Sequence, residues 1–144
     1  MPEVSAYFIA TGVAWVIAQG TKYLLSVTAS GKRDMRAWYQ SGNMPSAHTA
    51  TMVALTTIVG LQEGVESALF AVTTVLTTIT MYDSMMSRRA VGEQGLALRK
   101  LIEKSPFAKD RLPHHALGHL PQEVAAGALL GVVIGVVVDF LITR

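Results

Sequence analysis

The sequence predicts an all-α fold, an integral membrane bundle of four transmembrane helices with an interfacial cytosolic helix or loop. Composition is the first reason. Hydrophobic residues make up 51% of the 144 residues and charged residues only 15%, whereas soluble globular chains carry roughly 25% charged residues. The second reason is that the apolar residues gather in four runs, with most charges in the polar segments between them. A chain of this length fits a single membrane domain.

The first predicted span covers residues 4–27, which are apolar or small apart from Gln19 and Lys22. It is long enough to cross a hydrocarbon core, which needs about 20 residues. Lys22 lies near the far end, where a lysine either reaches the membrane interface or serves a functional site. After the polar segment 28–44, the second span covers 45–60. It is short, so we expect its start to lie below the headgroups in a protein-lined cavity, where polar backbone is tolerated.

The third span covers residues 66–86, and the fourth covers 121–142. Between them lies a long polar segment, 87–120, on the same side of the membrane as 28–44. Its interior, from Glu93 to Glu103, is predicted to form an amphipathic helix at the membrane surface.

The fourth span carries Gly127, Gly131 and Gly135 at intervals of four residues, which places them in one stripe along a helix. Such a stripe allows another helix to approach closely, either within the bundle or across a homodimer interface. Asp139 is the charge near the distal end of this span, and we expect it to be an interfacial or packing residue.

Four spans that alternate in direction bring one set of polar residues to the same side of the membrane. The members of this set are Lys22, Arg36, Ser46, His48, Asp83, Arg88, Arg89, His119 and Glu123. Of the 12 Lys and Arg residues, all except Arg144 belong to this side. The positive-inside rule therefore predicts that the polar side is cytoplasmic and that both termini are outside.

The start of the second span combines Pro45, Ser46 and His48. Proline suits the first turn of a helix, and the unbonded N–H groups of that turn can hold an anion. Two histidines, a carboxylate and fixed cations beside such a helix start suit phosphoryl transfer, in which one imidazole attacks phosphorus and the other protonates the leaving oxygen. A carboxylate bonded to the attacking imidazole would fix its tautomer, and His119 and Glu123 are four residues apart.

Three motifs together resemble the divergent branch of the type 2 phosphatidic acid phosphatase superfamily, which also includes vanadium-dependent haloperoxidases. They are Met44-Pro-Ser-Ala-His48, then Asp83 with Arg88-Arg89 and Gly92-Glu-Gln94, and finally Leu117-Gly-His-Leu-Pro-Gln-Glu-Val124. The resemblance extends from Lys22 to Gly131. It implies a metal-independent, membrane-embedded phosphatase that acts on the phosphomonoester or pyrophosphate of a phospholipid or isoprenoid.

The resemblance also implies roles for individual residues. His119 would be the nucleophile, Glu123 would orient it in place of the Asp of the parent superfamily, and His48 would be the general acid. The residues implied to bind phosphate are Lys22, Arg36, Ser46, Ala47, Arg88 and Arg89, with Ala47 standing where the parent has Gly. Asp83 is a supporting residue that either holds an Arg or sets the protonation of a His.

The expected partners are a lipid-phosphate substrate and membrane lipids, with no cofactor, no metal and no nucleic acid, and the expected location is a bacterial-type inner or plasma membrane. A second interpretation takes His115, His119 and Glu123 as metal ligands at four-residue intervals, completed by His48 or Asp83. A third is a non-catalytic membrane scaffold that binds or transports lipids or anions.

Overall fold

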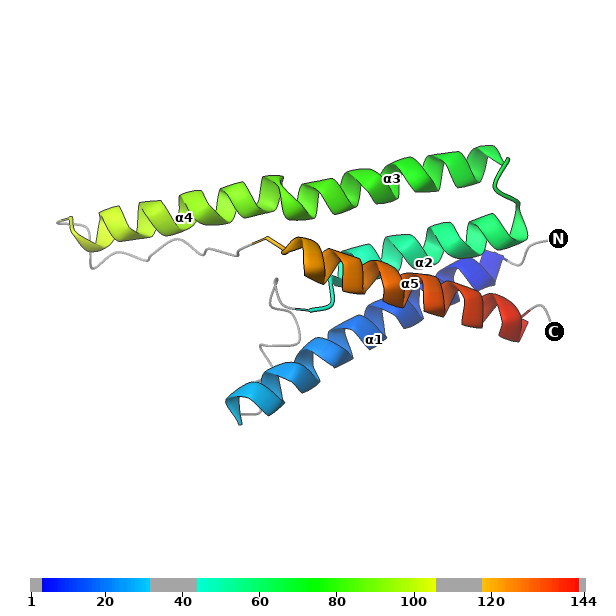
Figure 1. Ribbon diagram of the computed structural model, residues 1–144, viewed down its shortest axis with the longest axis horizontal. Helices are drawn as coiled ribbons and strands as arrows, with labels where there is room; N and C mark the ends of the chain where they lie inside the picture. Colours follow the sequence, from blue (N-terminus) through cyan, green and yellow to red (C-terminus); the bar gives the residue numbers. More distant parts are fainter. Residues whose placement is uncertain (1–3, 32–43, 106–117, 143–144) are drawn as a thin grey trace.

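The computed structural model describes residues 4–31, 44–105 and 118–142, which contain helices and no strand. This confirms the all-α prediction. The helices are α1 (Val4–Ser30), α2 (Ala47–Gln62), α3 (Ala68–Met85), α4 (Ser87–Glu103) and α5 (Pro121–Ile142) (Figure 1). The four predicted spans correspond to α1, α2, α3 and α5, with ends that differ from the prediction by three residues or fewer.

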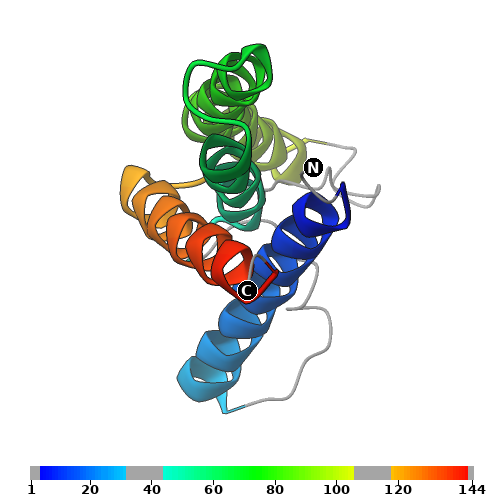
Figure 2. The same ribbon diagram turned by 90° about the vertical axis from the view of Figure 1, so that its right-hand side faces the viewer.

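Helix α2 lies at the centre of the bundle, and α1, α3 and α5 pack around it (Figure 2). Only two of its residues, His48 and Leu61 near its ends, are exposed. It has 16 residues, or about 24 Å of helix, which is less than a hydrocarbon core requires. Its sides face protein rather than lipid, so its length is not constrained as that of a lipid-facing helix is.

Three helical segments of the described chain are long and apolar enough to cross a membrane. They are Val4–Ala29, Ala68–Glu103 and Pro121–Ile142. Large apolar side chains stay exposed on these segments, including Phe8, which is 74% exposed, and Leu129, which is 69% exposed. Contact with lipid tails explains such a surface, which would be unfavourable in water. The protein is therefore an integral membrane protein.

Helix α1 approaches its neighbours through a stripe of small residues. The stripe repeats every fourth residue and is fully buried at Ala6, Ala10, Ala14 and Ala18. The next position of the same stripe is Lys22, which is 5% exposed. The face of α1 that packs into the bundle thus changes from methyl groups to a cation as the helix nears its end.

Helices α2 and α5 run parallel and in close contact. A Cβ atom on Gly127 would lie 2.5 Å from the carbonyl oxygen of Ser46, and one on Gly131 would lie 2.5 Å from that of Ala50. Gly135 lies against a side chain instead, since a Cβ there would be 2.7 Å from Cβ of Thr57. Of the two uses predicted for the glycine stripe, close packing within the bundle is the one found here, and α2 covers the glycines that a homodimer was expected to use.

Hydrogen bonds between side chains fix the other neighbours of α2. The hydroxyl groups of Thr56 and Thr77 are 2.8 Å apart, and Thr77 also donates to the carbonyl oxygen of Met52 over 3.1 Å, which joins α3 to α2. At the end of the bundle where α1 begins, Gln62 Nε2 donates to Asp139 Oδ1 over 3.0 Å. Asp139 is therefore a packing residue, as predicted.

Helix α4 begins earlier than predicted. The sequence indicated a helix from Glu93 after a polar loop, whereas α4 begins at Ser87 and continues α3 almost without interruption (Figure 1). Helical hydrogen bonding persists through the junction, because Met86 N–H donates to Tyr82 and Ala90 N–H donates to Met86, both over 2.9 Å. Among the described helices, α4 approaches only α3, which it follows in the chain.

The packing of α5 on α2 predicts a contrast between two glycine substitutions. Gly131→Leu should destabilise the protein by about 1–3 kcal/mol, because the new side chain would displace α2 backbone. Gly12→Leu should be neutral or stabilising, because nothing lies within 4 Å of a Cβ at that position of α1. Thermal unfolding in detergent measures both, and equal effects would contradict the close packing.

Candidate functional site

Four parts of the chain meet at one end of the bundle. These are the turn of α1 around Lys22, whose charge acts on Glu123 and His48, the start of α2, the junction of α3 with α4, and the start of α5 (Figure 1). Two backbone hydrogen bonds join the last three of these parts: Ser46 N–H donates to the carbonyl oxygen of Glu123 over 3.0 Å, and His119 N–H donates to that of Ser84 over 2.9 Å. The predicted convergence of polar residues on one side is therefore present in the described part of the chain.

His119 and Glu123 form a buried pair at the start of α5. His119 Nδ1 and Glu123 Oε2 are 2.9 Å apart, and His119 is 5% exposed. Because a carboxylate only accepts hydrogen bonds, Nδ1 carries the proton and the lone pair is on Nε2. The same carboxylate oxygen accepts from Leu120 N–H over 3.1 Å, which holds it in place. This arrangement orients the ring and favours the tautomer with the proton on Nδ1.

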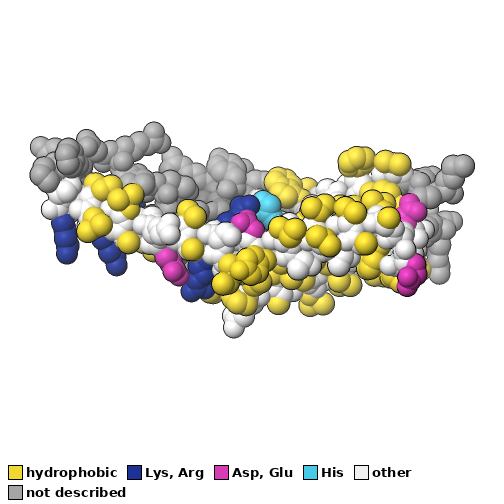
Figure 3. Space-filling view, turned by 90° about the horizontal axis from the view of Figure 1, so that it is seen from above, with side chains coloured by type: hydrophobic (Ala, Val, Ile, Leu, Met, Phe, Trp, Pro, Cys, Tyr) yellow, Lys and Arg dark blue, Asp and Glu magenta, His cyan; other side chains and the backbone are white. Residues whose placement is uncertain are grey.

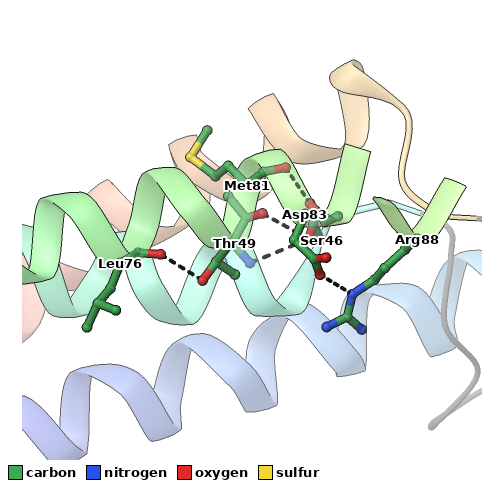
Figure 4. Close-up of polar contacts among 8 residues, drawn as sticks. Ser46, Thr49, Leu76, Met81, Asp83 and Arg88 are labelled. Carbon is green, nitrogen blue, oxygen red and sulfur yellow. Dashed lines mark hydrogen bonds and ion pairs between the residues drawn. The ribbon is translucent and has the colours of Figure 1, made fainter. Parts of the chain in front are cut away.

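Ser46 is the N-terminal cap of α2. Its Oγ accepts from Thr49 N–H over 3.4 Å and is 3.0 Å from the Thr49 hydroxyl (Figure 4). The helix accordingly begins at Ala47, so Pro45 precedes it rather than occupying its first turn as predicted. Ser46 is fully buried. The N–H groups left to meet an anion here are those of Ala47 and His48, at the positive end of the α2 dipole.

Positive charge reaches this place from two other helices. Lys22 is buried and interacts electrostatically with Glu123, and none of the ion pairs among the described residues includes it. Arg88 Nε donates to Asp83 Oδ2 over 2.7 Å (Figure 4). The charges of Lys22 and Arg88 both act on His48, as do those of Asp83 and His119. Six of the predicted site residues are thus connected, because five of them interact electrostatically with His48 or with Lys22.

Burial favours the functional interpretation of Lys22 over a lysine that reaches the membrane surface, because its side chain points into the bundle. Asp83 pairs with Arg88, which agrees with the first of its two predicted roles, although this pair is about half exposed rather than buried. Its charge also acts on His48, so the second role stays open. The space-filling view shows acidic, basic and histidine side chains gathered where α3 meets α4 (Figure 3).

Some predicted site residues do not join this group. Arg89 donates to Glu93 over 3.2 Å along α4 and is not among the charges that act on His48. Arg36 and His115 lie outside the described residues. Within the described ranges there is no group of three His, Asp or Glu side chains that could hold a metal ion, so the metal interpretation has no support in that part of the chain.

Sequence reasoning missed Gly118 and the backbone of Ser84. A Cβ at Gly118 would lie 2.5 Å from Arg89 N and 2.7 Å from Ser84 O, so only glycine lets the backbone of residue 118 lie this close to the α3–α4 junction. The glycine next to His119 was visible in the sequence. The contact with the carbonyl group of Ser84 could not be predicted, because every residue has a backbone carbonyl group and the sequence does not mark this one.

The fold and the site together define a class: a small all-α membrane protein with a buried His–Glu pair beside the starts of two parallel helices. The chain belongs to the Divergent PAP2 family, whose model matches residues 4–134, and this confirms the resemblance carried by the motifs. It is also similar to the uncharacterized membrane protein YuiD of Bacillus subtilis (strain 168), with 34% identity over 141 residues, covering 88% of this chain and 89% of YuiD. No solved structure matches it.

The cap of α2 predicts the effect of a small substitution. Ser46→Ala should lower the free energy of unfolding by about 0.5–2 kcal/mol, because Thr49 N–H loses its acceptor. Ser67→Ala is the matched control: Ser67 caps α3 at the other end of the bundle, where it accepts from Phe70 N–H over 3.1 Å. Ser46→Ala should cost more, because Ser46 is buried and Ser67 is partly exposed. Chemical denaturation in mild detergent compares them, and an unchanged stability in Ser46→Ala would contradict the capping role.

Proposed function

We propose that this protein is a membrane-embedded, metal-independent phosphatase that removes phosphate from the phosphomonoester or pyrophosphate of a phospholipid or isoprenoid. The observation that carries the proposal is the buried pair of His119 and Glu123, 2.9 Å apart. A histidine held in one tautomer by a carboxylate, beside helix starts and cations, is what an attack on a phosphate group requires. Membership of the Divergent PAP2 family supports the same reaction class.

In the proposed first step, Nε2 of His119 attacks phosphorus and the bond from phosphorus to the leaving oxygen breaks. His48 gives its proton to that oxygen, which leaves as an alcohol or a phosphate ester. Glu123 stabilises the positive charge that the ring of His119 acquires. In the second step a water molecule loses a proton to His48 and attacks the phosphohistidine, which releases inorganic phosphate and restores both histidines.

The cations and helix starts would stabilise the charge on the phosphate oxygens. Lys22 and Arg88 are positioned for this by α1 and by Asp83, and the N–H groups of Ala47 and His48 add the partial positive charge of a helix start. Arg36, Arg89 and the hydroxyl of Ser46 remain further phosphate ligands of the proposal. Ser46 would have to leave its capping position to serve as one, because it is enclosed.

The proposed topology has four crossings, with α2 as the fourth, supported by the protein that surrounds α2 on its sides. The site would face the cytoplasm of a bacterial-type cell, with α1 beginning and α5 ending on the outer side of the inner membrane. The support is charge: apart from Arg144, every Lys and Arg belongs to α1's last turns or to the segments next to the site. In Figure 3 the visible basic side chains lie over α4 and the α3–α4 junction, where acidic ones also lie, while the opposite end shows acidic side chains and no basic ones.

The reaction predicts a specific pattern of inactivation. In purified protein assayed for phosphate release from a panel of lipid phosphates, His119→Asn should lower kcat by roughly 10⁴-fold or more, because the nucleophile is gone. His48→Asn should lower it by about 100- to 10,000-fold, because only the proton donor is lost. Arg99→Gln is the control and should keep full activity, because Arg99 pairs with Glu103 on the surface of α4. Undiminished release by His119→Asn would overturn the mechanism.

Inhibitors separate the proposed chemistry from metal catalysis. Vanadate should inhibit phosphate release, because it takes the geometry of phosphate under attack and can bind His119 in the same way. A chelator should leave the rate unchanged. Loss of activity on chelation, restored by adding a divalent metal, would contradict the phosphohistidine mechanism and favour the metal site.

The alternative is a non-catalytic membrane scaffold that binds or transports lipids or anions. One observation favours it: the hydroxyl of Ser46, a predicted phosphate ligand, is enclosed and bonded to Thr49. Binding of a lipid phosphate to the wild-type protein without any release of phosphate would support the scaffold, whereas turnover of any lipid phosphate would exclude it.

A further inference from the structure

Gln19 is a buried side chain of α1 whose hydrogen-bonding capacity is not fully used. It is 8% exposed, and its Oε1 is buried and accepts no hydrogen bond from the described residues. A buried acceptor without a donor is unfavourable, and such atoms in folded proteins call for an explanation. The threonines nearby differ in this respect: Thr11 and Thr21 donate to carbonyl groups of their own helix.

The position of Gln19 connects it with the phosphate site. It precedes Lys22 by three residues, so the two side chains lie on the same side of α1, one turn apart. Because α1 runs toward the site, Gln19 lies about 4.5 Å deeper in the bundle than Lys22. Lys22 in turn interacts electrostatically with His48 and Glu123. The residue with the unused acceptor is therefore one helical turn deeper in the bundle than the cation of the candidate site.

Gln62 provides a comparison, because its Oε1 is also buried and unbonded. Its Nε2, however, donates to Asp139 over 3.0 Å at the opposite end of the bundle. That amide joins α2 to α5 and has a structural role. Gln19 lies one turn from the buried cation of Lys22. A ligand with an anionic group for Lys22 and a nearby hydrogen-bond donor for Oε1 of Gln19 would satisfy both side chains.

We propose that Gln19 determines substrate specificity: its Oε1 accepts a hydrogen bond from a hydroxyl or ammonium group that the lipid carries on the carbons next to its phosphate. The inference rests on the proposed function, in which Lys22 binds the phosphate. A lipid whose phosphate lies at Lys22 and whose hydrocarbon enters the bilayer places its first carbons at the level of Gln19. An isoprenoid phosphate has no donor there, so it leaves Oε1 unsatisfied and binds less well.

The test uses two lipids that differ in one group. The first is a monoacylglycerol phosphate with a free hydroxyl on its middle carbon, and the second is the same lipid with hydrogen in place of this hydroxyl. For the wild-type protein, kcat/KM should favour the first lipid by roughly 5- to 150-fold, which corresponds to satisfying one buried acceptor. Gln19→Met, which keeps the length and removes the amide, should bring the ratio close to one.

Gln62→Met is the matched control, because it removes the other amide with an unbonded Oε1 and should leave the ratio as in the wild type. Thermal unfolding of both variants checks that they fold. Equal kcat/KM values for the two lipids in the wild-type protein would overturn the inference without any variant. A preference that survives Gln19→Met unchanged in a folded protein would also overturn it.

A binding measurement separates this inference from the proposed reaction. The affinity of His119→Asn for each lipid is measured by titration in detergent, with and without Gln19→Met. A preference for the hydroxyl-bearing lipid that disappears with Gln19→Met supports the role of Gln19 even if the wild-type protein releases no phosphate, in which case only the proposed function fails. Equal affinities for the two lipids overturn the inference, whether or not turnover occurs.

Discussion

The close approach of α5 to α2 is the contact on which the site depends. Gly127 and Gly131 have no side chain, so the backbone of α5 lies directly on the carbonyl groups of Ser46 and Ala50. Because lipid tails are as apolar as the helices, such packing, rather than the hydrophobic effect, holds two membrane helices together. A methyl group at either glycine would separate the helices. The same contact brings the starts of the two helices together, because Gly127 lies against Ser46, the cap of α2.

Two helices that run parallel and begin together place two positive dipole ends side by side. The hydrogen bond from Ser46 N–H to the carbonyl oxygen of Glu123 joins these starts. His48 in the first turn of α2 and His119 just before α5 are thereby held near one another, with Lys22 contributed by α1. The fold thus gathers positive potential at one end of a largely apolar bundle. This is a physical basis for holding an anion where water is scarce.

Much of this arrangement could be predicted from residue types and spacing. Alternating helices had to bring Lys22, His48, Asp83 and His119 to one end, and the i to i+4 spacing of His119 and Glu123 allowed their pairing.

The details of the α3–α4 junction could not be predicted. A polar segment after an apolar span suggests a loop. Residues 86–92 contain no proline, however, and in the structure the helical hydrogen bonds continue through Met86. The first residue of α2 could not be predicted either. Serine is common as an N-terminal cap and proline is common in the first turn, so Pro45 and Ser46 fit more than one helix start.

The sequence by itself determined the class of fold, the end of the bundle that carries the charges, and the motifs of the Divergent PAP2 family, because hydrophobic runs, their alternation and residue identity are local properties. Only the tertiary structure decided which alternatives hold. It placed the glycine stripe against α2, buried Lys22 and joined Arg88 to Asp83. It also left Oε1 of Gln19 without a donor. Each of these depends on which surfaces meet, and a surface acquires its partner only when the helices pack.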